Sequence, residues 1–525
     1  MQNSRKIIIG SRGSDLALWQ AQFVIASLGK LGVVTELKII KTQGDKIQDL
    51  SFDKLEGKGF FTKEIEEALL NKEIDLAVHS HKDLPTVSPT GLTIAAVSER
   101  EDPSDILLIR KEFVDAKKRL QIKEGALVGT SSARRKSQLL AFRSDLNIQD
   151  LRGNVPTRIE KLRKGDYEAI MLAAAGVERL EIDLSEFHVN YLSPKEFNPA
   201  PAQGVLALQT RDDDKDLIEV LQKMNAPHVK ETIAIERKIL NLFEGGCQMP
   251  VGVYCETETN DEDEIKYKVW LSKAEKGDTP LSCFYLETKH PETAAERLVE
   301  KARNFKPSKV FISQNKRKED LFVSLLEKQQ YSVHAQSLIE FKIIPFKATP
   351  ESDWVFFSSK HAVKYFFLQK PQIGKVQFGV VGKSTADELR KFGHKADFVG
   401  QSTDTKAIAR QFAALAGGKK VLFPQAKGSL MSVQHQMPKK DNVINLTVYE
   451  TLSSDATTIP TCDILVFTSP SNIDSYLSKQ TISPEQKIVV MGDATANHLG
   501  RKGIKNVTKT SSFDDLGLAR AVFSC

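Results

Sequence analysis

Long apolar runs are missing from this 525-residue sequence. No stretch approaches the ~18 consecutive apolar residues that a membrane-spanning helix needs. The apolar run that begins at Ile7 is too short for the core of a signal peptide. We therefore expect neither a membrane span nor a secretory leader.

Cysteine is scarce, with five residues scattered along the chain. Their number is odd and no Cys-x-x-Cys pair occurs, so the pattern indicates neither a disulfide framework nor a zinc site. We expect no metal and a reducing, cytoplasmic location. The five are Cys247, Cys255, Cys283, Cys462 and Cys525.

A strong excess of one charge sign is also missing, since the formal net charge is only +6. A nucleic-acid-binding domain usually has a basic stripe with interleaved aromatic residues, whereas the arginines here fall singly at expected helix starts. We expect no nucleic-acid partner. A mildly basic chain suits a small substrate with several negative charges.

Short apolar runs alternate with amphipathic helical patterns. This alternation favours α/β domains with mostly parallel sheets, and the length suggests three to five domains, at about 100–200 residues each. The expected strands are 6–11, 33–40, 74–79, 127–130, 147–151, 169–173, 267–272, 283–288, 309–312, 354–357, 378–381, 420–423, 464–467 and 487–491. The expected helices are 14–28, 63–70, 133–142, 157–164, 230–243 and 293–303.

Two segments of the second half echo two others. Residues 355–359 resemble 466–470, and residues 380–386 resemble 490–496. We expect two lobes of similar build after a short linker at 304–308.

Arginines recur where an expected strand ends and the next helix begins. They are Arg12, the pair Arg134 and Arg135, and Arg152 with Arg158. A helix N-terminus disfavours cations and attracts anions, and Arg grips carboxylates bidentately. The alternative is a set of solvated surface arginines, but three repeats of the pattern favour a polyanionic ligand. Ser132 and Asn154 are expected N-caps.

A second feature follows the strand expected at 74–79. His79, His81, Lys82 and Asp83 occur together there. Asp83 is either a surface turn residue or a carboxylate that handles protons or stabilises a developing cation. The histidines have metal-like spacing, but no further ligand cluster accompanies them.

A third feature is Cys247, which follows Gly245 and Gly246. A lone cysteine is usually inert packing. Flanking glycines favour instead a thiol that a ligand can approach closely.

Together these stretches closely resemble porphobilinogen deaminase (hydroxymethylbilane synthase) over about residues 5–303, in family order. The resemblance implies two type II periplasmic-binding-protein-like domains and a small α+β domain with the cofactor cysteine. The implied boundaries are 1–98 with 197–215, then 99–196, then 216–303. The matching segments are 11–20, 57–61, 79–85, 99–103, 129–135, 151–158, 201–204 and 244–248.

The same resemblance implies the chemistry. Cys247 would hold a dipyrromethane cofactor through a thioether, and Asp83 would be the catalytic aspartate. Four porphobilinogen units would be added in turn, each with loss of ammonia, before hydrolysis releases hydroxymethylbilane. Each pyrrole carries an acetate and a propionate, which agrees with the arginine pattern.

The resemblance also assigns residues to binding roles. Lys58 would lie in the family's mobile loop over the cleft. Cofactor contacts would come from Ser80, Lys82, Asp83, Arg134, Arg135 and Arg152. Substrate contacts would come from Arg12, Ser14, Arg158, Arg179 and Gln203.

The module from 309 to 525 resembles uroporphyrinogen-III synthase, on residues 354–359, 381–386, 449–451 and 467–470. The resemblance implies two α/β lobes, about 309–345 with 452–525 and about 346–451, joined by a two-stranded connection. Such an enzyme cyclises hydroxymethylbilane, inverts the last ring and uses no cofactor. The candidate site residues are Tyr449, Ser358, Ser469 and Thr495, each of which can equally be a turn residue.

One departure concerns the first strand of that module. The family often has an arginine after that strand, whereas this chain reads Ile312-Ser313-Gln314-Asn315.

Two readings compete with a bifunctional, monomeric enzyme. The second module can be a degenerate, structural partner of an active deaminase. More remotely, the chain can be a non-enzymatic binding protein for an anionic solute, but such a protein has no use for Cys247 or Asp83.

Overall fold

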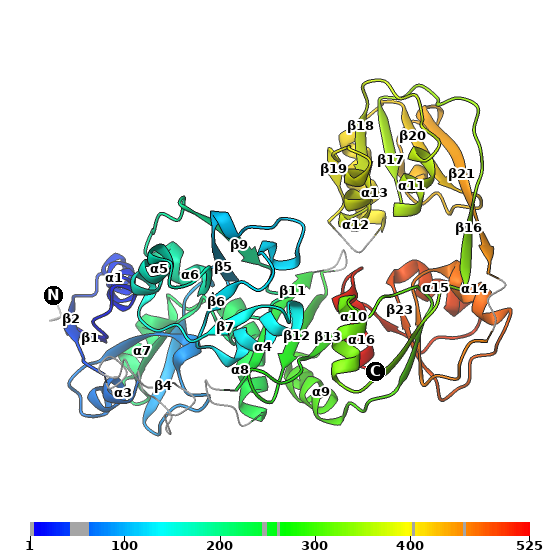
Figure 1. Cartoon of the computed structure of the whole chain (residues 1–525). Helices are drawn as coiled ribbons and strands as arrows, with labels where there is room; N and C mark the ends of the chain where they lie inside the picture. The colour runs from blue at the N-terminus through cyan, green and yellow to red at the C-terminus, as the bar shows by residue number, and fades with distance from the viewer. Residues whose placement is uncertain (1–4, 43–61, 244–248, 260–262, 402–404, 455–457) are drawn as a thin grey trace. The chain divides into compact units, whose positions relative to one another are not determined.

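The structure is a computed structural model that describes residues 5–42, 62–243, 249–259, 263–401, 405–454 and 458–525 (Figure 1). The chain divides into two compact units, Met1–Lys306 and Pro307–Phe523. None of the described helices is long and apolar enough to cross a membrane.

The first sheet of the first unit has the order β2-β1-β3-β10-β4. β1 runs parallel to β2 and β3, whereas β10 is antiparallel to both of its neighbours. The strands are β1 (Ile7–Ser11), β2 (Thr35–Ile39), β3 (Leu76–Ser80), β4 (Leu92–Val97) and β10 (Leu206–Arg211). The helices are α1 (Asp15–Lys30), α3 (Lys63–Leu70) and α7 (Lys215–Gln222). α1 buries Val24 and Leu28 in a core shared with Ile9 of β1.

The second sheet has the order β7-β6-β8-β5-β9. β6 runs parallel to β7 and β8, and β5 is antiparallel to β8 and β9. The strands are β5 (Asp105–Arg110), β6 (Leu127–Gly129), β7 (Asn147–Gln149), β8 (Ala169–Ala173) and β9 (Phe187–Leu192). The helices are α4 (Ala133–Phe142), α5 (Val155–Lys164) and α6 (Ala174–Arg179).

A three-stranded antiparallel sheet completes the first unit, in the order β11-β12-β13. Two helices pack against each other and against this sheet. The elements are α8 (Pro227–Leu242), β11 (Val251–Thr259), β12 (Ile265–Lys273), β13 (Ser282–Thr288) and α9 (Pro291–Asn304).

The second unit contains two further sheets, β15-β14-β22-β23-β24 and β16-β21-β20-β17-β18-β19. β16 and β21 pair antiparallel and lead from one sheet to the other (Figure 1). The strands are β14 (Lys309–Ile312), β15 (Ser332–Ala335), β16 (Ile339–Ile343), β17 (Trp354–Phe357), β18 (Gln377–Val380), β19 (Phe398–Val399), β20 (Val421–Ala426), β21 (Val443–Ser453), β22 (Ile464–Phe467), β23 (Lys487–Val490) and β24 (Thr508–Lys509). The helices are α10 (Leu321–Lys328), α11 (Lys360–Phe367), α12 (Lys383–Lys391), α13 (Thr405–Ala416), α14 (Pro470–Leu477), α15 (Gly492–Arg501) and α16 (Asp515–Phe523).

The sequence echoes correspond to equivalent strand–helix units. The first echo covers β17 with α11 and β22 with α14, and the second covers β18 with α12 and β23 with α15. Ser359 and Ser469 cap α11 and α14 in the same way, by accepting a hydrogen bond from the backbone N–H three residues on. The similar build expected for the two lobes is thus visible in their local structure.

The expectation of mostly parallel sheets is wrong for the first unit, where both α/β sheets are mixed. β10 enters the first sheet antiparallel after the chain has passed through the second sheet, and β5 enters the second sheet antiparallel to β8 and β9. A chain that crosses between two sheets need not re-enter in the direction that a local strand–helix–strand connection would impose.

Candidate active site

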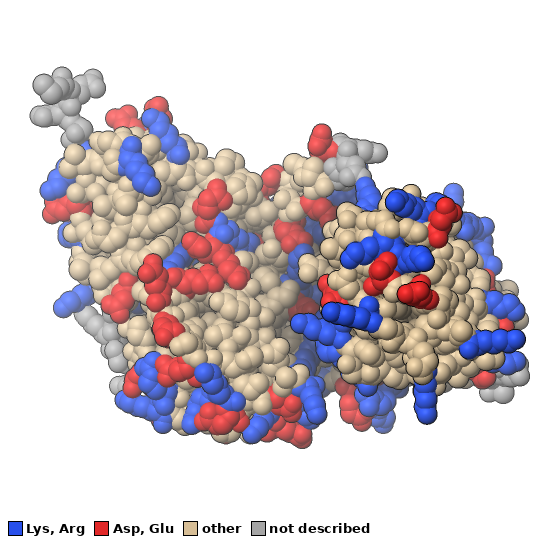
Figure 2. Space-filling view, turned by 90° about the horizontal axis from the view of Figure 1, so that it is seen from above, with Lys and Arg blue, Asp and Glu red and all other residues tan. Residues whose placement is uncertain are grey.

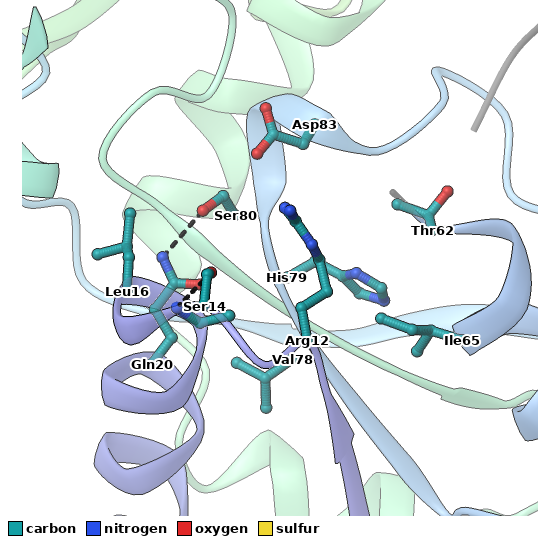
Figure 3. A pocket seen from close by; sticks show the side chains of 11 residues that line it. Arg12, Ser14, Leu16, Gln20, Thr62, Ile65, Val78, His79, Ser80 and Asp83 are labelled. Atoms are coloured by element: carbon teal, nitrogen blue, oxygen red, sulfur yellow. Dashed lines mark hydrogen bonds between the residues drawn. The ribbon is translucent and has the colours of Figure 1, made fainter. Parts of the chain in front are cut away.

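An open pocket lies at the carboxyl ends of β1 and β3 (Figure 3). Arg12 and Asp83 extend toward the same space from these two strand ends. Open α/β sheets bind ligands at this edge. The pocket is lined by Arg12, Ser14, Leu16, Ala17, Gln20, Thr62, Ile65, Val78, His79, Ser80 and Asp83.

The turn after β1 places Arg12 and Ser14. Ser14 caps α1, since its hydroxyl accepts a hydrogen bond from Ala17 N at 3.4 Å. Further along α1, Gln20 Nε2 donates to Ser80 Oγ at 2.9 Å, which ties the helix to the end of β3. The sequence-predicted residues of the two strand ends are therefore brought together.

The end of β3 continues into a short 3-10 turn, His81–Asp83, which carries Lys82 and Asp83 beyond the strand. Asp83 is exposed and Lys82 is half-buried. Burial lowers the pKa of Lys82 to about 8. The nearby cations Arg135 and Arg134 lower this pKa further, whereas the carboxylates of Asp83 and Asp105 raise it. Cations from the second sheet therefore lie near this strand end.

The two histidines of this segment are buried. His79 Nε2 lies 3.1 Å from Gln209 Oε1 of β10, and the amide nitrogen of Gln209 donates to Glu66 Oε1 at 3.2 Å. Burial lowers the pKa of His79 and of His81 to about 4, so both are neutral near pH 7. No group of three or more potential metal ligands occurs among the described residues.

Arg134 and Arg135 begin α4, which Ser132 caps as predicted. Both arginines are buried and share one carboxylate, Asp105 at the start of β5. Arg134 Nη1 donates to Asp105 Oδ2 at 2.7 Å, and Arg135 Nη2 donates to Asp105 Oδ1 at 2.7 Å. The pair is thus held inside the protein at the edge where β6 ends.

Arg152 and Arg158 flank the start of α5, which Asn154 caps as predicted. Arg158 Nε donates to the carbonyl of Gly153 at 2.8 Å. Burial lowers the pKa of Arg158 to about 10, with Arg135 and Arg152 adding repulsion and Asp83 opposing it. The cations from two helix starts therefore converge toward Asp83.

Arg179 and Gln203 are both buried. Arg179 Nη2 donates to the Gly204 carbonyl at 2.7 Å, and its guanidinium lies 5.8 Å from the centre of the Trp19 ring. Gln203 Oε1 accepts from Lys82 Nζ at 3.2 Å. Gln203 therefore contacts the turn that follows β3, and Arg179 lies against Trp19 of helix α1.

Cys247 and Lys58 lie outside the described residues.

In the second unit, the candidate residues make separate contacts. Tyr449 is buried, and its hydroxyl lies 3.3 Å from the Ser359 hydroxyl, beside the exposed Ser358. Ser469 caps α14. Thr495 Oγ1 donates to the Met491 carbonyl at 2.9 Å within α15.

Two charged residues that form ion pairs were not predicted from the sequence. Asp105 could have been noticed because an acidic residue opens an otherwise apolar strand, and a buried carboxylate requires cationic partners. Lys316 follows β14, where the family arginine is absent, and its largely buried side chain forms an ion pair with Asp515. Its spacing from the strand gives no comparable signal.

Three family models match the chain. "Porphobilinogen deaminase, dipyromethane cofactor binding domain" matches residues 7–219, and "Porphobilinogen deaminase, C-terminal domain" matches residues 230–303. "Uroporphyrinogen-III synthase HemD" matches residues 320–518.

Curated relatives agree with the first two models. A porphobilinogen deaminase from Oceanobacillus iheyensis is 47% identical over 264 residues, which cover 50% of this chain and 82% of the relative. One from Bacillus cereus is 47% identical over 263 residues, which cover 50% of this chain and 84% of the relative.

Solved structures with local likeness are more distant. A uroporphyrinogen-III synthetase from Helicobacter pylori has 19% identity and a TM-score of 0.31, and the match covers 40% of this chain and 96% of that one. A periplasmic binding protein from Salmonella typhimurium with arginine specificity has 12% identity and a TM-score of 0.26, with coverages of 42% and 91%.

Proposed function

The chain belongs to the porphobilinogen deaminase family, and from that premise we propose how its residues carry the reaction. It is an enzyme of tetrapyrrole biosynthesis. It joins porphobilinogen units to one another, which gives hydroxymethylbilane as the product, and it uses a dipyrromethane cofactor. Its second unit is a uroporphyrinogen-III synthase domain.

The residues at the site fit a dipyrromethane. Its pyrrole rings carry carboxylates, and buried cations outnumber carboxylates where the two sheets meet. The pKa values of Lys82 and Arg158 are lowered by burial and by repulsion from neighbouring arginines. A bound anion would offset that repulsion. When bound, the cofactor supplies the free α-carbon to which the first porphobilinogen is joined. The proposed ligands are Cys247, Ser80, Lys82, Asp83, Arg134, Arg135 and Arg152.

Asp83 is the proposed catalytic residue. Its exposed carboxylate lines the pocket beside Arg12 and Ser80. It would accept hydrogen bonds from pyrrole N–H groups and stabilise the positive charge that develops on the substrate as ammonia leaves.

Carboxylates of the incoming substrate would bind to four residues around this pocket. Arg12 and Ser14 line it from the first sheet, and Arg158 and Arg179 approach from the second. Bidentate guanidinium contacts suit the acetate and propionate groups and would fix the register of the growing chain. Lys58 would act from the loop over the cleft.

The domain boundaries are also proposals: 1–98 with 197–215, 99–196, 216–303, a linker at 304–308 and the synthase module at 309–525. The return of β10 to the first sheet supports the discontinuous first domain. The proposed lobes of the module are about 309–345 with 452–525 and about 346–451, and the passage of β16 and β21 between two sheets supports them.

We also propose a cytoplasmic monomer that binds no nucleic acid. The buried thiols of Cys255 and Cys462 suit a reducing compartment. The arginines of the site are engaged with buried carboxylates and carbonyls, which supports a small anionic ligand over a nucleic-acid backbone.

The synthase domain would cyclise the released hydroxymethylbilane to uroporphyrinogen III. Tyr449, Ser358, Ser469 and Thr495 remain its candidate site residues. The internal hydrogen bond of Thr495 is the observation that favours the alternative, an active deaminase with a structural second unit.

The observation that carries the deaminase proposal is that Lys82 and Arg158 lie near Asp83, with Arg135 near both of these cations. The test is intact-mass measurement of the full-length protein with and without Cys247→Ser. We expect a covalent adduct on the parent chain that grows with added porphobilinogen and is missing in the variant. An adduct of unchanged mass on C247S would refute the attachment site.

A further inference from the structure

We propose that Asp105 is a positioning residue, which holds Arg134 and Arg135 in the arrangement that receives the carboxylates of the dipyrromethane. Gln203 extends this arrangement to Lys82. The inference rests on the proposed function and adds two residues that act through others.

Asp105 contacts both guanidinium groups directly. It is fully buried, and its Oδ2 accepts from Arg134 Nη1 at 2.7 Å. Its Oδ1 accepts from Arg135 Nε at 3.1 Å and from Arg135 Nη2 at 2.7 Å, which is a fork-shaped contact. One carboxylate therefore sets the orientation of two adjacent arginines.

Each of the two arginines also donates a hydrogen bond to a main-chain carbonyl. Arg134 Nη1 also donates to the Asn198 carbonyl at 2.8 Å, and Arg135 Nη1 donates to the Met171 carbonyl at 3.1 Å. These contacts use fewer than the five N–H donors of each guanidinium. Each arginine can therefore bind an external carboxylate without leaving Asp105.

The electrostatics explain why the carboxylate is needed. Two neighbouring buried cations repel each other, and a buried charge without a partner costs several kcal/mol. Burial would raise the pKa of Asp105, but the two guanidinium groups hold it well below its usual range. Asp105 therefore stays ionised and offsets part of the repulsion, while the cluster keeps an excess of positive charge.

Gln203 joins this pair to the first sheet. Its Nε2 donates to Asp105 Oδ1 at 3.1 Å and to the Pro103 carbonyl at 2.8 Å, while its Oε1 accepts from Lys82 Nζ at 3.2 Å. The side chain is 1% exposed, and both ends of its amide bind protein groups. Gln203 is therefore suited to orient Lys82, in place of the direct substrate contact that the resemblance implies.

A matched control exists at the C-terminal end of the same helix, α4. Arg143 follows α4 directly and forms a largely buried ion pair with Asp145, with Arg143 Nη2 at 2.7 Å from Asp145 Oδ2. Its other contacts are with the carbonyls of Arg119, Ile122 and Lys123 and not with the cation cluster. Asp145→Asn therefore removes a partly buried carboxylate from an arginine without touching Arg134 or Arg135.

The experiment uses full-length chains prepared without cofactor and then incubated with porphobilinogen. Intact mass gives the rate at which the covalent adduct forms, and thermal unfolding gives the stability of each variant. We expect Asp105→Asn to load at least about tenfold more slowly than the parent, because the variant loses charge-assisted hydrogen bonds to the two guanidinium groups. Once loaded, D105N should raise the KM for porphobilinogen more than it lowers kcat.

Asp145→Asn should load at the parental rate despite its loss of stability. Gln203→Met, which leaves both Asp105 ion pairs in place, should load several-fold more slowly. If D105N does not fold, the loading rate of Q203M decides the question, and a parental rate would overturn the proposal. Parental loading and KM in a folded D105N would overturn it as well. A parent chain that gains no adduct and makes no hydroxymethylbilane would instead refute the proposed function itself.

Discussion

The candidate sites of the two units differ in their chemistry. In the first unit, arginines and a lysine are partly or wholly buried around Asp83 and are fixed by Asp105, Gln203 and main-chain carbonyls. In the second unit, the candidate residues carry hydroxyl groups, such as Ser358 after β17 and Ser469, which caps α14.

Net charge does not reveal this difference. The chain's excess of basic residues lies in the second unit, whose Lys and Arg side chains stand out over the surface at the right of Figure 2. The first unit has slightly more acidic than basic residues, yet it holds the buried cation cluster. A polyanion site is therefore better located by buried cations with their counter-ions than by the sum of charges.

The largest effect is expected for Asp83→Asn, because Asp83 is the proposed stabiliser of developing positive charge. The variant should fold and lose about 10²–10³-fold in kcat for hydroxymethylbilane formation. Asp183→Asn is the control. Asp183 is an exposed turn residue whose carboxylate accepts a hydrogen bond from Ser185 N. Turnover of D83N within a few-fold of D183N would remove Asp83 from the mechanism.

Two arginines of helix α5 offer the next sharpest contrast. Arg158 faces the cluster, whereas Arg163 is exposed and pairs with Glu160 and Glu186. Arg158→Gln should lower kcat/KM about 10- to 100-fold through loss of a charge-assisted contact. Arg163→Gln should stay within about twofold, because exposed ion pairs contribute little. Equal losses in steady-state kinetics would contradict the proposed buried site.

A smaller effect is expected from pH. The pKa of Lys82 is lowered to about 8, so its ammonium loses charge as the pH rises through that value. The KM for porphobilinogen should therefore rise several-fold between about pH 7.5 and 9, while a lysine in the unfolded chain stays protonated to about pH 10.4. Over the same interval stability should increase, since the unfolded chain then binds more protons.

Lys82→Arg is the control for this pH dependence, because a guanidinium stays charged. The KM of K82R should be flat over the same pH range. An identical rise in both proteins would assign the titration to another group.

The smallest effect is expected in the second unit, for Tyr449→Phe. The variant loses the contact with the Ser359 hydroxyl and about 1 kcal/mol of stability. The share of uroporphyrinogen III among the products should fall a few-fold at most. Tyr365→Phe is the control, because the Tyr365 ring packs 5.3 Å from that of Tyr449. A share of isomer III that is lower in Y365F than in Y449F would argue against Tyr449.

Local features of the site could be predicted from the sequence. Ser132 and Asn154 cap their helices as expected, and Arg12, Arg135 and Asp83 follow strand ends as expected. Such features depend on residues close together in the chain, so periodicity and capping patterns reveal them.

The tertiary part of the site could not be predicted in this way. Asp105 meets Arg134 and Arg135 about thirty positions along the chain, and Gln203 reaches Lys82 from more than a hundred positions away. No local pattern encodes these pairings. For the same reason the antiparallel entry of β10 into the first sheet was missed, because it depends on a path through the second sheet.

We expect both units to be active in one chain. The most direct test incubates the purified full-length protein with porphobilinogen, oxidises the products and separates the uroporphyrin isomers by chromatography. With both units active, we expect predominantly isomer III. Isomer I alone would show that the first unit makes hydroxymethylbilane which then closes without catalysis, and would contradict an active second unit.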